Sequence, residues 1–248
     1  MLKELINNQK TVFITGANRG IGLGIAKYCD SQGFNLILHA RREISDDILG
    51  QFQNLINVAI FDINDTQTMS KEINRILSTD VKIDILVNCA GLTNDSLFVN
   101  MTADQFKNVI NTNFLGTVNV INCVIPKMIA QNEGAIINIS SAIAEIGNVG
   151  QVNYAASKSA LIDFTHLYAQ EYAANGIRVN AICPGMIVSS MTDRLSGKMK
   201  KYALSKIPLK RFGKSFEVAQ MVIAVALNTY MTGSIVDING GLRMGNNS

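Results

Sequence analysis

A tyrosine and a lysine stand four residues apart in segment 153–158, NYAASK. If this segment is helical, Tyr154 and Lys158 lie on one face of the helix, with their β-carbons about 5–6 Å apart. A nearby ammonium favours phenolate and lowers a tyrosine pKa that starts near ~10. The pair could therefore carry out acid–base chemistry, although a pair without function on a solvated helix face has the same spacing.

Few other residues offer alternative chemistry. The chain has two histidines, His39 and His166, so a zinc site or a histidine-dependent triad is not expected. Its four cysteines are scattered without a CxxC spacing and are expected to be small buried side chains in a reducing compartment. No metal site is predicted, and proton transfer is left to groups such as Tyr154.

Length and composition predict one domain. A chain of 248 residues, 48% of them hydrophobic, can bury the core of a large α/β domain. No apolar run approaches the ~18 residues of a membrane span, and the first ten residues are too short and too polar for a secretory signal. These features predict a cytoplasmic protein.

Short runs rich in Ile and Val alternate with longer helical patterns. Such a pattern predicts a seven-stranded parallel sheet covered on both faces, the doubly wound Rossmann-type architecture, over residues 1–248. The expected strands are 11–15, 35–39, 57–61, 83–88, 134–140, 176–182 and 234–238. Residues 186–214 break the alternation, are rich in lysine and are predicted to form a lid. Ligands of such sheets bind at the carboxyl ends of the strands.

A glycine-rich turn, TGANRGIG at 15–22, follows the first expected strand and opens a helical pattern. Gly16, Gly20 and Gly22 would permit a tight turn and let the backbone approach a pyrophosphate at the helix N-terminus. A glycine-rich connection without a ligand is the alternative. The position between strand and helix favours dinucleotide binding.

Five motifs then occur in order: TGANRGIG, LVNCAG at 86–91, a serine at 141, YAASK at 154–158, and PG at 184–185. With these motifs the chain resembles the short-chain dehydrogenase/reductases, and most of all the 3-oxoacyl-(acyl-carrier-protein) reductases. The resemblance runs from residue 11 to Gly241. The five motifs together are specific for this family, whereas any one of them alone would be weak evidence.

The resemblance implies roles for four residues. Tyr154 matches the family's general acid, and Lys158 matches the residue that lowers the phenol pKa and bonds the nicotinamide ribose. Ser141 matches the serine that hydrogen-bonds the substrate carbonyl, although the adjacent Ser140 remains an alternative. Asn113 matches an asparagine that holds a water in the proton relay, with a buried structural amide as the alternative.

The resemblance also implies a cofactor site. Asp62 matches the residue that bonds the adenine amine, although it could instead cap the following helix. Cys89 stands where the family more often has Asn or Asp. The full set implied to contact the cofactor is Gly16, Asn18, Arg19, Gly20, Ile21, Gly22, Arg41, Asp62, Ile63, Asn88, Ala90, Gly91, Tyr154, Lys158, Pro184, Gly185, Ile187 and Ser189.

The end of the second strand indicates which nicotinamide cofactor is used. Ala40 occupies the position where NAD-dependent relatives have an aspartate, so the acidic partner of the ribose 2′-OH is missing. Arg41 follows it, and Arg19 lies in the glycine turn; a guanidinium suits a 2′-phosphate. NADP is therefore expected, with two arginines exposed on a polar helix as the alternative.

The lid is predicted to gather an anionic substrate, such as a carrier-bound or coenzyme A thioester or a nucleotide-linked sugar. A solvated lysine-rich helix is the alternative. Against a carrier protein, Asn132 and Asn175 stand where the resembling reductases often have arginines. Eight basic and no acidic residues lie in 194–214: Arg194, Lys198, Lys200, Lys201, Lys206, Lys210, Arg211 and Lys214.

The expected function is NADPH-dependent reduction of a ketone to a secondary alcohol, with a 3-oxoacyl thioester as substrate. The rivals are a reductase or dehydrogenase of a sugar, polyol or secondary metabolite, and a non-catalytic cofactor-binding regulator. A nucleic-acid module is disfavoured by a net charge of +3 and the lack of Trp. The resemblance also implies a homotetramer, with helices 102–131 and 152–175 at the interface.

Overall fold

A computed structural model describes residues 10–188, 192 and 196–244. Seven parallel strands form one sheet in the order β3-β2-β1-β4-β5-β6-β7. The strands are β1 Thr11–Ile14, β2 Asn35–Ala40, β3 Leu55–Ile60, β4 Ile85–Asn88, β5 Gly134–Ile139, β6 Ile177–Pro184 and β7 Ile235–Ile238. The predicted doubly wound seven-stranded architecture is confirmed.

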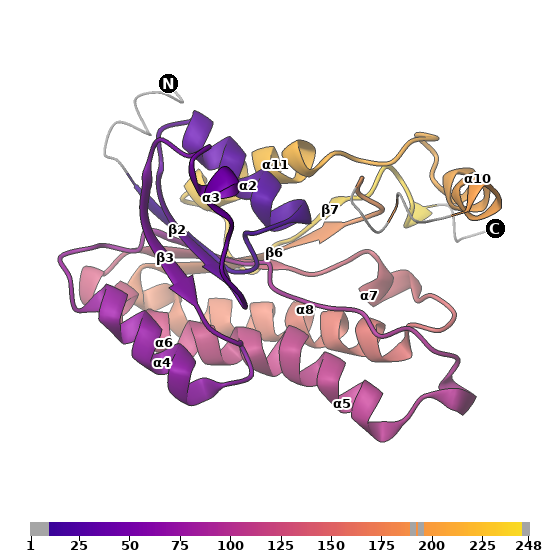
Figure 1. The fold of residues 1–248 in the computed structure, drawn as a ribbon, viewed down its shortest axis with the longest axis horizontal. Coiled ribbons are helices and arrows are strands. Elements are labelled where there is room, and N and C mark those ends of the chain that lie inside the picture. The colour runs from indigo at the N-terminus through magenta and orange to yellow at the C-terminus, as the bar shows by residue number, and fades with distance from the viewer. Residues whose placement is uncertain (1–9, 189–191, 193–195, 245–248) are drawn as a thin grey trace.

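Helices cover both faces of this sheet (Figure 1). One face carries α2 Gly20–Ser31, the short α3 Asp46–Leu49 and α11 Ser215–Leu227. The other carries α4 Thr66–Leu77, α5 Ala103–Ile110, α6 Gly116–Gln131 and α8 Val152–Tyr172. The short α7 Ile143–Ile146 follows β5, and α10 Gly197–Lys206 lies in the predicted lid.

Each strand supplies side chains to two cores because successive residues point to opposite faces. In β1, Val12 and Ile14 pack with α2 and α11, whereas Phe13 between them packs on the other side with α4 and α6. All three are buried. This explains why the strands read as continuous apolar runs rather than as alternating ones.

The expected helix 102–131 is interrupted. A π-helical turn, η2 Asn111–Leu115, separates α5 from α6. By length and composition the run Ala103–Gln131 is apolar enough to cross a membrane, with a mean hydropathy of 1.2 in its best window. Half of that window is buried, and the run packs against α4 and α8, as a core helix does.

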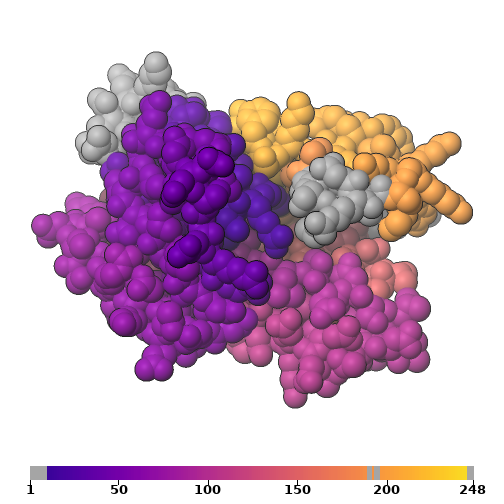
Figure 2. All heavy atoms as spheres, in the orientation of Figure 1, coloured from indigo at the N-terminus to yellow at the C-terminus, as the bar shows by residue number. Residues whose placement is uncertain are grey.

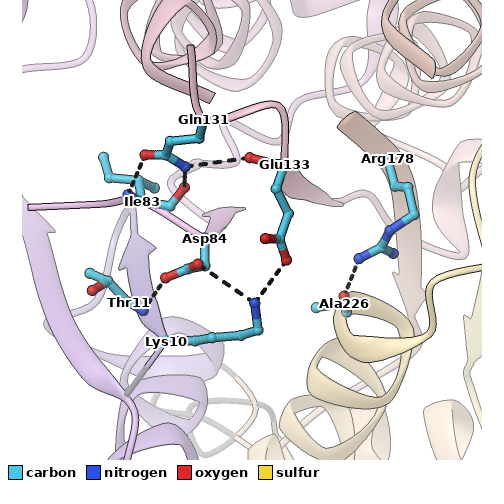
Figure 3. A network of polar contacts seen from close by, with 8 residues as sticks. All are labelled: Lys10, Thr11, Ile83, Asp84, Gln131, Glu133, Arg178 and Ala226. Atoms are coloured by element: carbon cyan, nitrogen blue, oxygen red, sulfur yellow. Dashed lines mark hydrogen bonds and ion pairs between the residues drawn. The ribbon is translucent and has the colours of Figure 1, made fainter. Parts of the chain in front are cut away.

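Charged side chains join the amino ends of the strands (Figure 3). Lys10, just before β1, contacts Glu133 at 2.9 Å and Asp84 at 3.6 Å. Asp84 also accepts the backbone N–H of Thr11 at 2.7 Å. Arg178 on β6 donates to the carbonyls of Val225 and Ala226 in the last turn of α11 and of Asn228 and Met231 just after it. These contacts join the amino ends of β1, β4 and β5 to one another and join β6 to the end of α11.

Candidate active site

The predicted site residues converge at the carboxyl edge of the sheet. Those among the described residues lie at the ends of β1 to β6 or just after them, at the start of α2, on α8 and on the π turn between α5 and α6. In Figure 2 the indigo N-terminal part, the magenta segment around α5 and the orange α10 region border this face. Parallel strands bring these distant segments together because all their carboxyl ends share one edge.

The two adjacent serines after β5 have different partners. Ser141 hydrogen-bonds Tyr154 on α8, and its Oγ also accepts the N–H of Ile143 at 3.2 Å. The Oγ of Ser140 instead donates to the backbone carbonyl of Lys158 at 2.8 Å. Ser141 is therefore the serine that shares the site with the phenol, and Ser140 anchors the helix.

Lys158 lies beside the Tyr154 ring, and its ammonium group binds a backbone carbonyl. Its Nζ donates to the carbonyl of Ile139 at 2.8 Å and lies 5.8 Å from the Tyr154 ring centroid. The side chain is buried. The two residues are on one face of α8, as the spacing predicted.

The expected lowering of the tyrosine pKa by Lys158 is not found. Burial raises the pKa of Tyr154 to about 12, against the opposing hydrogen bond from Ser141. Burial also lowers the pKa of Lys158 to about 8, although the nearby thiols Cys89 and Cys183 oppose that change. At neutral pH the phenol thus keeps its proton, which is the state that can donate one.

Asn113 is held by the π turn η2, a feature common near functional sites. Its Oδ1 accepts the N–H of Leu92 at 2.8 Å, and its Nδ2 donates to the Leu92 carbonyl and to Ser157 Oγ. The amide thus has the partners of a buried structural amide. It also lies next to Lys158, because a β-carbon on Gly91 would meet both Asn113 Oδ1 and Lys158 Nζ within 3.6 Å.

Two glycines of the turn are required by protein contacts and one is not. Gly16 has φ +68, and a β-carbon there would lie 2.8 Å from Ala90 Cα. A β-carbon on Gly22 would lie 2.3 Å from Gly16 O. Gly20 has φ +58, and a β-carbon there would have no atom of the described residues within 4 Å. Its open surroundings, next to a helix N-terminus without a side-chain cap from Arg19, fit a bound pyrophosphate.

The segment after β4 is fixed by a threonine that the sequence reading did not select. Thr15 Oγ1 accepts the N–H groups of Cys89 and Ala90 at 3.0 and 3.1 Å. Asn88 donates to Asn138 Oδ1 at 2.9 Å, while its own Oδ1 is buried and has no hydrogen-bond partner among the described residues. Ala90 is half-buried and Gly91 is exposed. The signal for Thr15 was its place at the head of the glycine motif.

Asp62 does not cap the helix after β3. Asp65 does so instead, accepting the N–H of Thr68, whereas Asp62 Oδ1 accepts the N–H of Asn64. Asp62 remains half-exposed and open to a ligand, while Ile63 is buried against Gly116. The capping alternative is therefore wrong.

Of the residues expected to choose between NAD and NADP, the two arginines lie at the surface. Arg19 and Arg41 are exposed, and Asn18 and Ile21 are half-buried. Ala40 is fully buried at the end of β2.

The base of the predicted lid is held by main-chain bonds. Val188 donates to the Gly213 carbonyl at 2.8 Å, and Gly213 donates to the Met186 carbonyl. Ile187 is buried, and Gly185, after Pro184, donates to Ile238 O at the end of β7. Ser189 and Arg194, named above for the cofactor and for the lid charge, lie outside the described residues.

Ser157 is a further site residue that sequence reading missed. Its Oγ donates to the Tyr154 carbonyl at 2.7 Å and accepts from Asn113 at 3.0 Å. It thereby links the π turn to the tyrosine. Across residues 10–188, 192 and 196–244, no group of three or more His, Cys, Asp or Glu side chains could hold a metal ion.

Comparison with known proteins agrees with this geometry. The short chain dehydrogenase family matches residues 10–200. The 3-oxoacyl-(acyl-carrier-protein) reductase FabG of Staphylococcus aureus is 38% identical over 95% of this chain and 98% of its own length. The reductases of the same name from Thermotoga maritima and Buchnera aphidicola are 38% and 40% identical over 94% and 96% of this chain, and 97% and 98% of their own.

Solved structures show the same fold. A putative gluconate dehydrogenase from Agrobacterium tumefaciens superposes with a TM-score of 0.88 at 23% identity, covering 94% of this chain and 96% of that one. The protein gox2181 gives 0.91 at 24% identity over 98% and 100%. With the family match and the relatives above, the chain belongs to the short-chain dehydrogenase/reductase family, oxidoreductases that interconvert CH–OH and C=O with a nicotinamide cofactor.

Proposed function

We propose that the protein reduces a ketone, carried as a 3-oxoacyl thioester, to a secondary alcohol with NADPH. The observation that carries this proposal is a protonated phenol, Tyr154, hydrogen-bonded to Ser141 beside the buried Lys158. The bound cofactor would supply the hydride. Tyr154 would give its proton to the carbonyl oxygen, and the Ser141 hydroxyl would hold that oxygen.

Lys158 and Asn113 would support this step. The Lys158 ammonium would stabilise the phenolate that Tyr154 becomes after it donates its proton, because an opposite charge favours the ionised form. We propose the Lys158 side chain also as a donor to the nicotinamide ribose. Asn113, on the π turn next to Lys158, would hold a water of the proton relay there.

The cofactor would lie across the carboxyl edge of the sheet. Gly20 leaves open space at the start of α2, where the pyrophosphate would meet N–H groups and the positive end of the helix. Asp62 keeps a half-exposed carboxylate for the adenine. The remaining proposed contacts are Gly16, Asn18, Arg19, Ile21, Gly22, Arg41, Ile63, Asn88, Ala90, Gly91, Pro184, Gly185, Ile187 and Ser189.

NADPH is proposed over NADH because β2 ends without an acid and two exposed guanidiniums flank the place of the 2′-phosphate. The combined change Ala40→Asp and Arg41→Ala should weaken NADPH and strengthen NADH binding, reversing the preference by about tenfold or more. Calorimetric titration with both cofactors measures it. An unchanged preference for NADPH would place the selectivity on Arg19 or another group.

A thioester substrate is supported by the names of the relatives and by the lysines of the lid. Lys198, Lys201 and Lys206 on α10 are exposed. The positive charge of the lid is smaller than the sequence count, because Arg211 forms a bidentate ion pair with Glu217 at 2.7 and 2.9 Å. The remaining cluster would still raise the local concentration of an anionic substrate.

Salt dependence tests this role of the lid. The kcat/KM for acetoacetyl coenzyme A should fall more steeply with ionic strength than that for a neutral ketone. The double variant Lys198→Gln, Lys201→Gln should flatten the slope, and the control Lys27→Gln, Lys71→Gln, on exposed lysines of α2 and α4, should not. Equal slopes for the two substrates would refute the electrostatic role.

The structure gives Asn132 a conformational reason to be Asn. Asn132 has φ 50, a left-handed conformation that Asn adopts more readily than a long side chain. It faces Gly176, the residue after Asn175. Any carrier protein would thus meet two neutral amides at this place.

The reaction is tested by a panel of carbonyl substrates with NADPH, in which 3-oxoacyl thioesters should be turned over fastest. Fastest turnover of a sugar or polyol would favour the rival enzyme. Cofactor binding without any turnover would favour the regulator.

We also propose that the protein is cytoplasmic and forms a homotetramer. The apolar side chains Leu115, Val152 and Leu167, on the side of the molecule that carries α6 and α8, are exposed and would be covered in such an assembly. Sedimentation analysis measures the size of the assembly.

A further inference from the structure

One buried histidine stands between the glycine turn and the third strand without a role in the proposed reaction. His39, near the end of β2, is 2% exposed. Its ring stacks on Phe61, with centroids 4.0 Å apart. Imidazoles are costly to bury unless both nitrogens find partners, so the partners of this ring are informative.

Both nitrogens have partners, and these define one tautomer. Nδ1 lies 3.2 Å from the backbone N of Gly16, which is a donor, so Nδ1 must accept. Nε2 lies 3.0 Å from the carbonyl O of Phe61, which is an acceptor, so Nε2 must carry the hydrogen. The ring is therefore neutral, and burial lowers its pKa to about 4, against the bond to Phe61 and the charge of Asp62.

The first of these bonds reaches the residue on which the turn depends. Gly16 has φ +68 and approaches Ala90 so closely that no side chain fits. The backbone of His39 adds a second tie, because its carbonyl accepts the N–H of Ala17 at 2.9 Å. The imidazole thus holds the turn from the side of β2 while Ala90 limits it from the side of β4.

We propose that His39 is a positioning residue for the cofactor: its neutral ring joins the glycine turn to the end of β3 and sets the geometry of the helix N-terminus at Gly20. The inference rests on the proposed cofactor site. The proposed role of His39 concerns the affinity for the cofactor and not proton transfer, since Tyr154 and Ser141 belong to other segments. The charge that acts on the ring is that of Asp62, after β3.

Two substitutions separate the two nitrogens. In His39→Asn, the amide oxygen can take the place of Nδ1 and still accept from Gly16. In His39→Gln, the longer amide can donate to Phe61 in place of Nε2 but leaves the Gly16 N–H without its acceptor. Both variants remove the ring stacking, so they form a matched pair.

Calorimetric titration of NADPH into the wild type and both variants, well below their unfolding temperatures, tests the proposal. We expect His39→Gln to raise the Kd about tenfold and His39→Asn less than about threefold, with kcat at saturating NADPH changed by less than about twofold in both. Equal Kd values in the two variants, or losses that only follow the thermal unfolding temperature, would overturn it.

The wild-type titration separates this inference from the proposed function. A wild type that binds neither NADPH nor NADH would overturn both. A wild type that binds NADPH, together with a His39→Gln variant that binds it equally well, would overturn only the role of His39.

Discussion

The two edges of the same sheet use ionisable side chains in opposite ways. At the amino edge, Lys10 contacts Glu133 and Asp84, and Arg178 serves the carbonyls at the end of α11 (Figure 3). At the carboxyl edge, the buried Lys158 donates to a backbone carbonyl, and Tyr154 keeps its proton in desolvated surroundings.

The pKa values show the consequence. Burial lowers the pKa of Lys10, but Glu133 and Asp84 outweigh it, and the net pKa is raised. For Lys158 burial dominates and the pKa falls to about 8. A raised lysine pKa means that folding favours the ammonium, and a lowered one means that folding disfavours it. The amino edge therefore contributes stability, whereas the carboxyl edge holds groups that folding alone does not favour, as expected of a site built for a ligand.

The largest expected effect is at the carboxyl edge. Tyr154→Phe removes only the hydroxyl and should lower kcat about a thousandfold, the range of a lost general acid. The unfolding temperature and the Kd for NADPH should stay close to the wild type. Steady-state reduction of an acetoacetyl thioester measures it, with Tyr230→Phe at a fully exposed tyrosine as control. Retention of most of the wild-type rate would remove Tyr154 from the mechanism.

As pH falls, the stability that depends on the carboxyl edge should be lost first. The pKa of His39 is about 4 in the fold and near 6.5 when unfolded, so between these values the unfolded chain binds a proton that the folded chain does not. The free energy of unfolding should fall as pH drops through this window, by about 3 kcal/mol in all. Denaturant titrations from pH 7 to 4 measure it. The slope should be smaller in His39→Gln; an identical slope would contradict the assignment.

The amino edge should respond to acid later. Contact with Lys10 lowers the pKa of Glu133 below its ordinary 4.5, so its contribution is present above that value and is lost as pH falls below it.

Removing a partner at the amino edge should cost stability and not activity. Arg178→Met leaves carbonyls at the end of α11 without their donor, and we expect a loss of about 2 kcal/mol. Activity well below the unfolding temperature should change by less than about twofold. Arg75→Met, at an exposed ion pair on α4, is the control. A large loss of turnover without a loss of stability would contradict the division between the edges.

The smallest effect is expected for the exposed ion pair. Lys10→Met should cost less than about 1 kcal/mol, because Glu133 is 69% exposed and water screens the pair. Added salt should shrink the difference further. Unfolding at low and high ionic strength measures it, and a loss as large as that of Arg178→Met would show that Lys10 is more than a surface partner.

The sequence predicted the features that depend on hydrophobic periodicity and on the steric demands of glycine turns. Continuous apolar strands indicated the parallel sheet, and the glycine turn and the Tyr154–Lys158 spacing indicated the carboxyl edge. It did not predict the direction of the Tyr154 pKa, because spacing says nothing of burial. It also left Ser140 and Ser141 unresolved, since their partners depend on where the chain turns after β5. Thr15, Ser157 and His39 were missed because their partners come from distant segments.

Replacing Lys158 with Met most directly tests the claim that the carboxyl edge favours function over stability. At pH 7 we predict that Lys158→Met unfolds with a free energy equal to or above that of the wild type, while NADPH-dependent reduction is lost. This difference should shrink as pH rises above 8, because the buried amine then loses its proton in the fold. A loss of about 2 kcal/mol, as expected for Arg178→Met, would contradict the account.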